Sequence, residues 1–361
     1  MTISAEPTQK STSHKSSSIV FVDPISRILG AFWGMWVGDA LAMPAHYYRD
    51  KDIIKRHYGL LNEFKAPHNT HPGSRMTRQT YNPFSTKADI VHDMKEQWTQ
   101  PGTHVHRSLK PGDSTLNLKL AKCLFESMQQ HGGYNEEDYI QRYLNLMLTP
   151  GAHGDTWVDE SHRTFFNHYA QGKPVSGCGD EDNSLTGVVI SLPILLHGWR
   201  DPHKASQQAD DLTDIAHKGR KVASTTKFLA HIFSWIFKNQ DLDTILYKKA
   251  GKGAHSCLNY PLKQWIDKDD FEVIGHLVHP GDHIEENMPT LMYLALKYQH
   301  NPGQALLVNA HAGGDSCHRG AILGAILGAI NGVESLPAEW VFGLNNYDEL
   351  DNLSDWLIES H

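Results

Sequence analysis

Hydrophobic residues recur along most of the chain at the three- and four-residue spacing of amphipathic helices, while the alternation of a strand is confined to Ile19 to Val22. The pattern predicts an all-α, single-domain globular array of helices. Asp113 or Ser114 is the expected cap of a helix that carries Leu116 and Leu120 on one face. Further helices are expected at about 24–43, 136–148, 155–170, 183–197, 221–238, 285–299 and 318–332.

The rest of the chain divides by composition. Residues 1–18 are polar and serine-rich, which is typical of a flexible tail. Residues 19–345 are expected to form the helical domain, and 346–361 a C-terminal segment. Residues 60–112 show no sustained period, so we expect a long loop region; loops of this length usually carry function.

Glycine occupies every fourth position in two of the predicted helices. The first run is Gly30, Gly34 and Gly38, followed by Asp39; the second is Gly320, Gly324 and Gly328, preceded by Asp315. Each glycine inside a helix costs roughly 1 kcal/mol relative to alanine. We therefore expect the two helices to pack closely through their glycine faces. An antiparallel arrangement brings Asp39 and Asp315 toward one pocket.

Small residues four apart are also found where membrane helices pack. The second run is shorter than the roughly 20 apolar residues of a span, and Pro24, Arg27 and Asp39 interrupt the first. The composition adds no other signal for a membrane partner. A net charge of -8 argues against nonspecific nucleic-acid binding. Four widely spaced cysteines predict reduced thiols and a cytoplasmic location.

Polar residues gather at the predicted helix ends, and three of these segments resemble the ADP-ribosylglycohydrolase family, which includes J1-type crystallins. Gly30 to Pro44 is similar to its G-x-x-x-G-x-x-x-G-D-A-L-G-x-P helix. Gly112 to Thr115 is similar to T-D-D-T, and Gly313 to Cys317 to G-G-D-T-D. The histidines around these segments resemble a divergent branch of the family.

The resemblance implies an all-helical hydrolase that cleaves an N- or O-glycosidic bond to ADP-ribose or a related nucleotide sugar. It also implies two magnesium ions between the second and third segments. Several residues depart from the family pattern at the expected ligands: His46, Gly112, Ser114, Cys317 and His318. Because a thiol is a poor ligand for Mg²⁺, we expect Mg²⁺ to bind weakly or at one position.

The predicted site follows from these segments, with a small-molecule or ADP-ribosylated substrate as partner. Asp39 and His46 are candidate catalytic residues, and Asp113, Ser114 and Asp315 are candidate metal ligands. The candidate substrate-binding residues are His106, Asp155, Thr156, Cys317 and His318.

Other interpretations of these residues stay open. Asp113, Asp155 and Asp315 precede helices and could simply cap them. Cys317 could be a nucleophile, or could join His104, His106 and His318 in a zinc site. The whole protein could also be a noncatalytic family member that binds ADP-ribose or serves a structural role, as the crystallins do.

Overall fold

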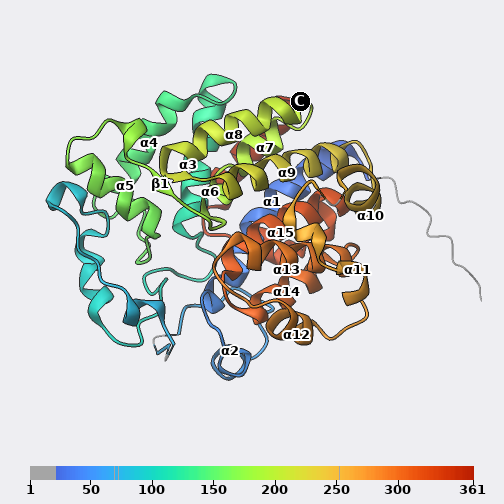
Figure 1. Cartoon of the computed structure of the whole chain (residues 1–361), viewed down its shortest axis with the longest axis horizontal. Helices are drawn as coiled ribbons and strands as arrows, with labels where there is room; N and C mark the ends of the chain where they lie inside the picture. The colour runs from blue at the N-terminus through green and yellow to red at the C-terminus, as the bar shows by residue number, and fades with distance from the viewer. Residues whose placement is uncertain (1–21, 69, 72, 252) are drawn as a thin grey trace, which may run out of the picture.

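The computed structural model describes residues 22–361 except 69, 72 and 252, and its fold is all-α, as the hydrophobic spacing predicts (Figure 1). Within the described residues, two-residue strands β1 (Asp180–Glu181) and β2 (His217–Lys218) pair in parallel. The α-helices are α1 (Pro24–Ala42), α2 (Lys51–Tyr58), α3 (Leu116–His131), α4 (Glu136–Leu148), α5 (Glu160–Ala170), α6 (Thr186–Ile190), α7 (Leu192–His197), α8 (Pro202–Ala216), α9 (Arg220–Phe237), α10 (Leu242–Thr244), α11 (Leu262–Trp265), α12 (Asp270–Glu272), α13 (Ile284–Lys297), α14 (Pro302–Ala312), α15 (Ser316–Asn331), α16 (Ala338–Phe342) and α17 (Tyr347–Glu359).

Helices α1 and α15 lie side by side at the centre of the molecule (Figure 1). A Cβ atom on Gly34 would lie 2.1 Å from the carbonyl oxygen of Gly324. Gly30 faces Gly328 in the same way, and Gly38 faces Gly320. This order of contacts confirms the predicted antiparallel packing through glycine faces. It also places the end of α1 beside the start of α15.

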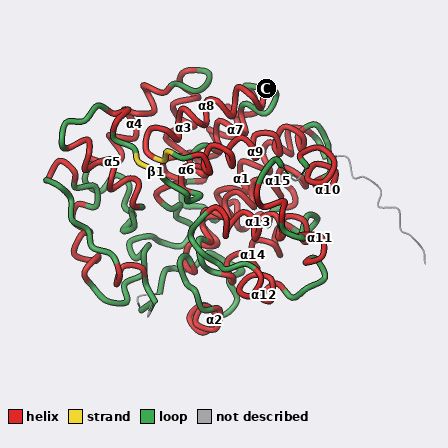
Figure 2. Tube along the Cα trace, viewed as in Figure 1, coloured by secondary structure: helices red, strands yellow, loops and turns green. Residues whose placement is uncertain are grey.

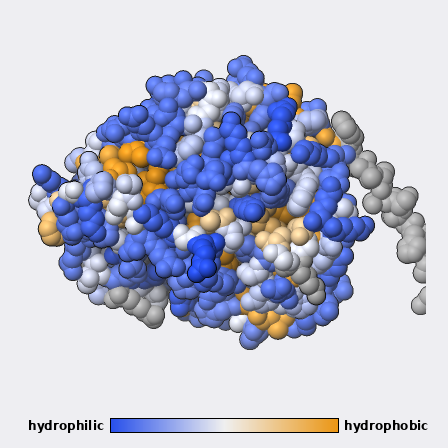
Figure 3. Space-filling view, turned by 45° about the horizontal axis from the view of Figure 1, so that its top comes forward, coloured by the Kyte–Doolittle hydropathy of each residue, from blue (hydrophilic) through white to orange (hydrophobic). Residues whose placement is uncertain are grey.

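The other helices surround this pair. Helices α13 and α14 pack on α15, while α17 packs on α1 and α3, so the C-terminal segment joins the same core. Among the described residues, one helical stretch, Pro24–Ala45, is long and apolar enough for a membrane span, but 94% of its 18-residue apolar window is buried inside the protein. It is therefore the core helix of this fold. The face shown in Figure 3 is mostly hydrophilic, with small apolar spots.

The structure corrects several predicted boundaries. Helix α5 begins at Glu160, so Asp155 and Thr156 lie in the preceding loop and do not cap this helix. The helix expected at 183–197 is divided into α6 and α7 at Ser191. The described residues of 60–112 form the expected long loop, with short 3₁₀ turns (Figure 2). Of the predicted strand, Ile19 to Phe21 lie outside the described residues and Val22 is not in a strand.

Three loops meet where α1 ends and α15 begins. The backbone N–H of Tyr47 donates to Gly314 O at 2.7 Å, and the N–H of Gly314 donates to Tyr48 O at 2.7 Å. The N–H of Asp315 donates to Gly281 O at 3.3 Å. A Cβ atom on Gly314, which has φ +61°, would lie 2.5 Å from Pro280 O. Glycine is required here because both its conformation and its neighbours exclude a side chain.

Candidate functional site

Two buried carboxylates hold the start of helix α3. The N-cap residue Thr115 makes no side-chain capping bond of its own. Instead, its N–H donates to Asp39 Oδ2 and its hydroxyl to Asp39 Oδ1, both at 2.8 Å. The N–H of Leu116 donates to Asp155 Oδ2 at 2.9 Å. Because the free N–H groups of a helix start carry partial positive charge, both carboxylates stabilise this end of α3 from distant segments.

Two imidazoles connect Asp155 to Asp315. Asp155 contacts His106 Nδ1 at 2.9 Å, and His106 Nε2 lies 2.6 Å from His46 Nδ1. His46 Nε2 then contacts Asp315 Oδ1 at 3.2 Å. The rings of His46 and His106 are nearly parallel, and neither residue is more than 2% exposed. The segments ending α1, preceding α3 and opening α15 thus meet in one buried polar cluster, composed of Asp39, His46, His106, Asp155, Asp315 and Cys317.

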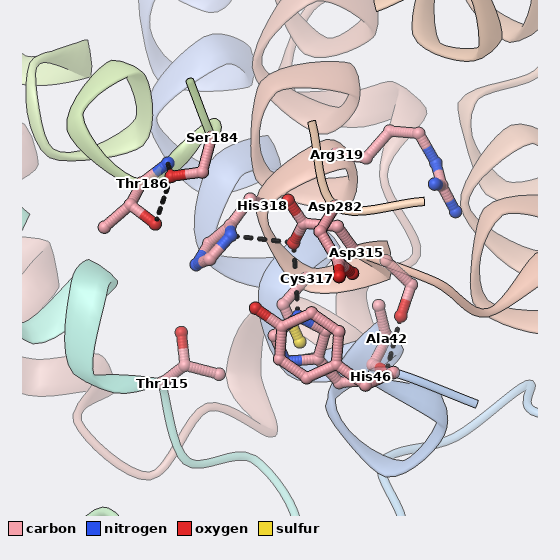
Figure 4. A network of polar contacts seen from close by, with 12 residues as sticks. Ala42, His46, Thr115, Ser184, Thr186, Asp282, Asp315, Cys317, His318 and Arg319 are labelled. Carbon is pink, nitrogen blue, oxygen red and sulfur yellow. Dashed lines mark hydrogen bonds and ion pairs between the residues drawn. The ribbon is translucent and has the colours of Figure 1, made fainter. Parts of the chain in front are cut away.

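A second branch of the cluster runs from Asp315 to Asp159. His318 Nδ1 lies 2.7 Å from Asp315 Oδ1 (Figure 4). The side-chain amide of Asn117 contacts His318 Nε2 at 2.7 Å and donates to Asp159 Oδ2 at 2.8 Å. Tyr47 covers this region, since its ring stacks on His46 with centroids 3.9 Å apart and its hydroxyl contacts Asp159 at 3.4 Å.

The environment sets opposite charge states in neighbouring groups. Burial disfavours a charged Asp315, but His318 and His46 outweigh this and hold the pKa of the carboxyl below its usual range. Burial lowers the pKa of His46 to about 3, so its ring is neutral near pH 7. Burial also opposes a charged His318, yet Asp315 and Asp159 raise its pKa to about 9. At neutral pH, Asp315 therefore lies ionised beside a protonated His318.

The geometry gives several predicted residues other roles. The carboxylate of Asp113 accepts from Lys110 N and Asn345 Nδ2, and both Asp113 and Ser114 line a separate surface pocket beside Asn345. They do not join Asp315 because α3 starts at Leu116, which directs Thr115 and Asn117 toward the cluster instead. The pair Asp113 and Ser114 is therefore not a metal site with Asp315.

Asp39 and Cys317 also differ from expectation. Both oxygens of Asp39 accept from Thr115, so this carboxylate positions the start of α3. Burial, followed by the nearby carboxylate of Asp39, raises the pKa of the Cys317 thiol well above its usual value, which disfavours the thiolate that a nucleophile requires. Thr156 is buried and contacts Ser108 Oγ at 2.7 Å, away from Asp315.

A cleft of about 330 Å³ lies beside the cluster. Tyr47, Tyr48 and His71 provide flat aromatic walls, and Arg49 and Arg75 provide positive charge. Arg75 lies over the ring of Tyr47 at 4.4 Å and pairs with Asp282 at 3.1 Å. Burial raises the pKa of Asp282, opposed by Arg75 and aided by the charge of Asp315. Tyr47 thus lines the cleft and also covers the cluster, and the charge of Asp315 acts on Asp282 in the cleft wall.

Sequence reasoning missed Arg75, Asn117, Asp159 and Asp282. Asn117 lies three residues after Ser114, inside a segment already singled out, and Asp282 follows a Pro-Gly turn like that before Asp113. Both signals could have been found. Arg75 gave no sequence signal, because it lies in a loop without periodicity. Its position over the Tyr47 ring depends on the fold.

The ADP-ribosylglycohydrolase family description matches residues 22–361. The chain belongs to the ADP-ribosylglycohydrolase family. It is 22% identical to "Uncharacterized protein YegU" of Escherichia coli (strain K12) over 347 residues, which cover 90% of this chain and 93% of that protein.

A solved structure, "ADP-ribosylglycohydrolase-related protein complex", shares the fold. Its TM-score is 0.61 at 21% sequence identity, and the match covers 93% of this chain and 98% of that chain. The resemblance drawn from the glycine helices and the two aspartate segments is thereby confirmed for family and fold.

The magnesium pair that the family resemblance implies does not fit the residues present. Mg²⁺ requires oxygen ligands in octahedral geometry. The donor atoms grouped with Asp315, however, are imidazole nitrogens of His46 and His318. Asp39 is engaged by Thr115, and Asp113 lies elsewhere. No chemical step is therefore assigned to magnesium.

Buried neutral histidines should make this protein acid-sensitive. Burial lowers the pKa of His162 to about 3 and that of His255 to about 4, against about 6.5 in an unfolded chain. Between these values the unfolded state binds more protons, so stability falls as the pH falls. We expect the Tm to drop by at least about 5 °C from pH 7 to pH 4.5, measured by calorimetry. His255→Asn replaces the ring Nδ1 that accepts from Cys257 N by an amide oxygen and should flatten this slope. An unchanged slope would contradict the assignment.

Proposed function

We propose that this protein hydrolyses a glycosidic bond to ADP-ribose or a related nucleotide sugar. The observation that carries the proposal is Asp282, a carboxyl with raised pKa in the cleft wall, next to the ionised Asp315. Neighbouring carboxyl groups with opposite pKa shifts are the arrangement that separates an acid from an anion in glycoside hydrolysis. Family membership supports the substrate class.

In this proposal the cleft binds the nucleotide diphosphate. Arg49 and Arg75 contact its phosphates, because guanidinium groups match phosphate oxygens in charge and geometry. Tyr47, Tyr48 and His71 offer aromatic faces for a base or sugar ring. The Tyr47 ring and Arg75 cover the buried cluster, so a productive complex requires these two side chains to move aside.

The chemical step then uses the two carboxyl groups. When Arg75 and Arg49 leave Asp282 for the phosphates, Asp282 loses its two ion pairs and takes up a proton. It donates this proton to the departing side-chain atom as the glycosidic bond breaks. The ionised Asp315 stabilises the positive charge that develops on the sugar. A water molecule adds to the anomeric carbon and returns a proton to Asp282, which restores the starting state. His46 and His318 hold the Asp315 carboxylate in place throughout, through the contacts at 3.2 and 2.7 Å.

Arg75→Ala tests the substrate assignment. Loss of a guanidinium–phosphate contact should weaken ADP-ribose binding about tenfold or more, which corresponds to about 1.4 kcal/mol. Titration calorimetry of wild type and variant with ADP-ribose measures this. Arg107→Ala is a suitable control, since that arginine is exposed and lines none of the cleft. Equal affinities of wild type and Arg75→Ala for ADP-ribose would contradict the assignment of the cleft as the binding site.

A second candidate is a noncatalytic ADP-ribose-binding or structural family member. The observation in its favour is burial: Asp315 and His46 are each 1% exposed, and protein partners already occupy them. Under this alternative, ADP-ribose binds the cleft without turnover of any glycoside. Calorimetry together with product analysis separates the two candidates.

A further inference from the structure

Three side chains of the buried cluster direct soft or borderline donor atoms toward one another. They are His46, His106 and Cys317, whose possible ligand atoms all lie within 4.8 Å of each other. Their exposed fractions are 1%, 2% and 0%. Two imidazole nitrogens and one thiol sulfur form a donor set that suits Zn²⁺ far better than Mg²⁺.

The outer nitrogens of both histidines supply an independent observation. His106 Nδ1 faces Asp155 at 2.9 Å, and His46 Nε2 faces Asp315 at 3.2 Å. Metal-binding histidines typically donate their second ring N–H to a carboxylate, which fixes the ring and its tautomer. Here both rings are fixed in that way. The inner nitrogens, His106 Nε2 and His46 Nδ1, are therefore left facing each other at 2.6 Å.

Only one hydrogen or one cation can lie between His106 Nε2 and His46 Nδ1. A second group of possible ligands, His46, Asp315 and His318, needs no metal, because two imidazole nitrogens simply contact one carboxylate oxygen. His104 is not available either, since its Nε2 contacts Pro44 O and its Nδ1 accepts from His106 N. The geometry thus favours His46, His106 and Cys317 as the metal-binding group.

We propose that His46, His106 and Cys317 bind one Zn²⁺ or a similar borderline divalent cation in place of the shared hydrogen. Tetrahedral Zn–N bonds of about 2.0–2.1 Å hold two nitrogens about 3.3 Å apart, so the rings would separate by about 0.7 Å. The fourth position falls to a water or an oxygen of the same cluster. The burial of all three ligands points to a site that stabilises the cluster. The inference does not depend on the proposed hydrolase activity.

Metal binding can be measured without turnover. Full-length protein is stripped with a chelator and titrated with Zn²⁺ by calorimetry, then reconstituted with Co²⁺ for absorption spectroscopy. We expect one equivalent of either ion, no displacement by excess Mg²⁺, and a sulfur-to-cobalt charge-transfer band. Cys317→Ser should abolish that band. Asp155→Asn, which removes the carboxylate behind His106 and also changes an acceptor for Leu116 N, should weaken Zn²⁺ binding about 10- to 100-fold.

Cys178→Ser is the matched control, because Cys178 is also buried and its thiol also contacts backbone oxygens, as that of Cys317 does, but among the described residues it belongs to no group of possible metal ligands. This variant should keep the band. Far-ultraviolet circular dichroism confirms that each variant is folded. Failure of the stripped wild-type protein to bind Zn²⁺ stoichiometrically would overturn the proposal, and so would a cobalt spectrum without a sulfur band. The wild-type measurements decide the question even if a variant does not fold.

Discussion

Replacing Gly324 by alanine is expected to lower the free energy of unfolding by about 3 kcal/mol or more, although alanine favours a helix by roughly 1 kcal/mol. The new Cβ atom would lie 2.0 Å from Gly34 O and 2.7 Å from Gly34 C. These are backbone atoms of the facing helix, so no side-chain rotation relieves the overlap. Ordinary overpacking costs about 1–3 kcal/mol, and Gly324→Leu should exceed that range.

Gly303→Ala provides the matched control for this effect. Gly303 lies in α14, and a Cβ atom there would find its nearest neighbour at 3.9 Å, an ordinary contact. This variant should be neutral or slightly more stable. Denaturant unfolding of both variants gives the comparison. Equal stabilities of Gly324→Ala and wild type would contradict the close packing of α1 on α15.

Asp315→Asn should reduce kcat/KM for release of ADP-ribose about 10²–10³-fold or more, with little change in the size of the side chain. The substitution removes the negative charge that faces the developing cation, and loss of one preorganised electrostatic contact typically costs this much. It also removes the charge at 2.7 Å that raises the pKa of His318. Steady-state kinetics with an arginine- or serine-linked ADP-ribosyl substrate measures the loss.

Asp113→Asn is the control for this experiment. Asp113 belongs to the signature segment by sequence, but its carboxylate contacts Asn345 and the backbone of Lys110. We expect nearly unchanged kinetics from this variant. A large loss in Asp113→Asn with an active Asp315→Asn would reverse the assignment of the two aspartates.

The core of the fold was predictable because its signals are local. Glycines at every fourth position of two apolar segments specify a close helix pair, and the order of the residues specifies which glycines meet. Helices α8 and α14 went unpredicted, although Asp201 and Asn301 cap them with a proline at the first position. Their start signals are clear. The buried face of α8 consists partly of alanines, and the apolar residues of α14 do not gather on one face, so the spacing of large apolar residues did not reveal either helix.

The site was only partly predictable because its contacts are not local. His46, His106, Asp155, Asp315 and Cys317 were selected from the sequence, and the fold brings them together. The start of α3 shows why Asp113 was selected instead of Asn117. A local cap at Asp113 or Ser114 was expected, whereas Asp39 and Asp155, 76 and 39 residues from their partners, cap this helix. A sequence does not show which distant carboxylate will satisfy a helix end.

The central claim is that Asp315 in the buried cluster and Asp282 in the cleft wall together support hydrolysis. Product analysis in ¹⁸O-labelled water tests this claim most directly. Purified protein is incubated with a serine- or arginine-linked ADP-ribosyl peptide, and the products are identified by mass spectrometry. The account predicts free ADP-ribose that carries one ¹⁸O atom at the anomeric position, together with the unmodified peptide. Asp282→Asn, which lacks the proposed proton donor, should form this product much more slowly. Tight binding of ADP-ribose with no labelled product from either peptide would contradict the account and favour the noncatalytic alternative.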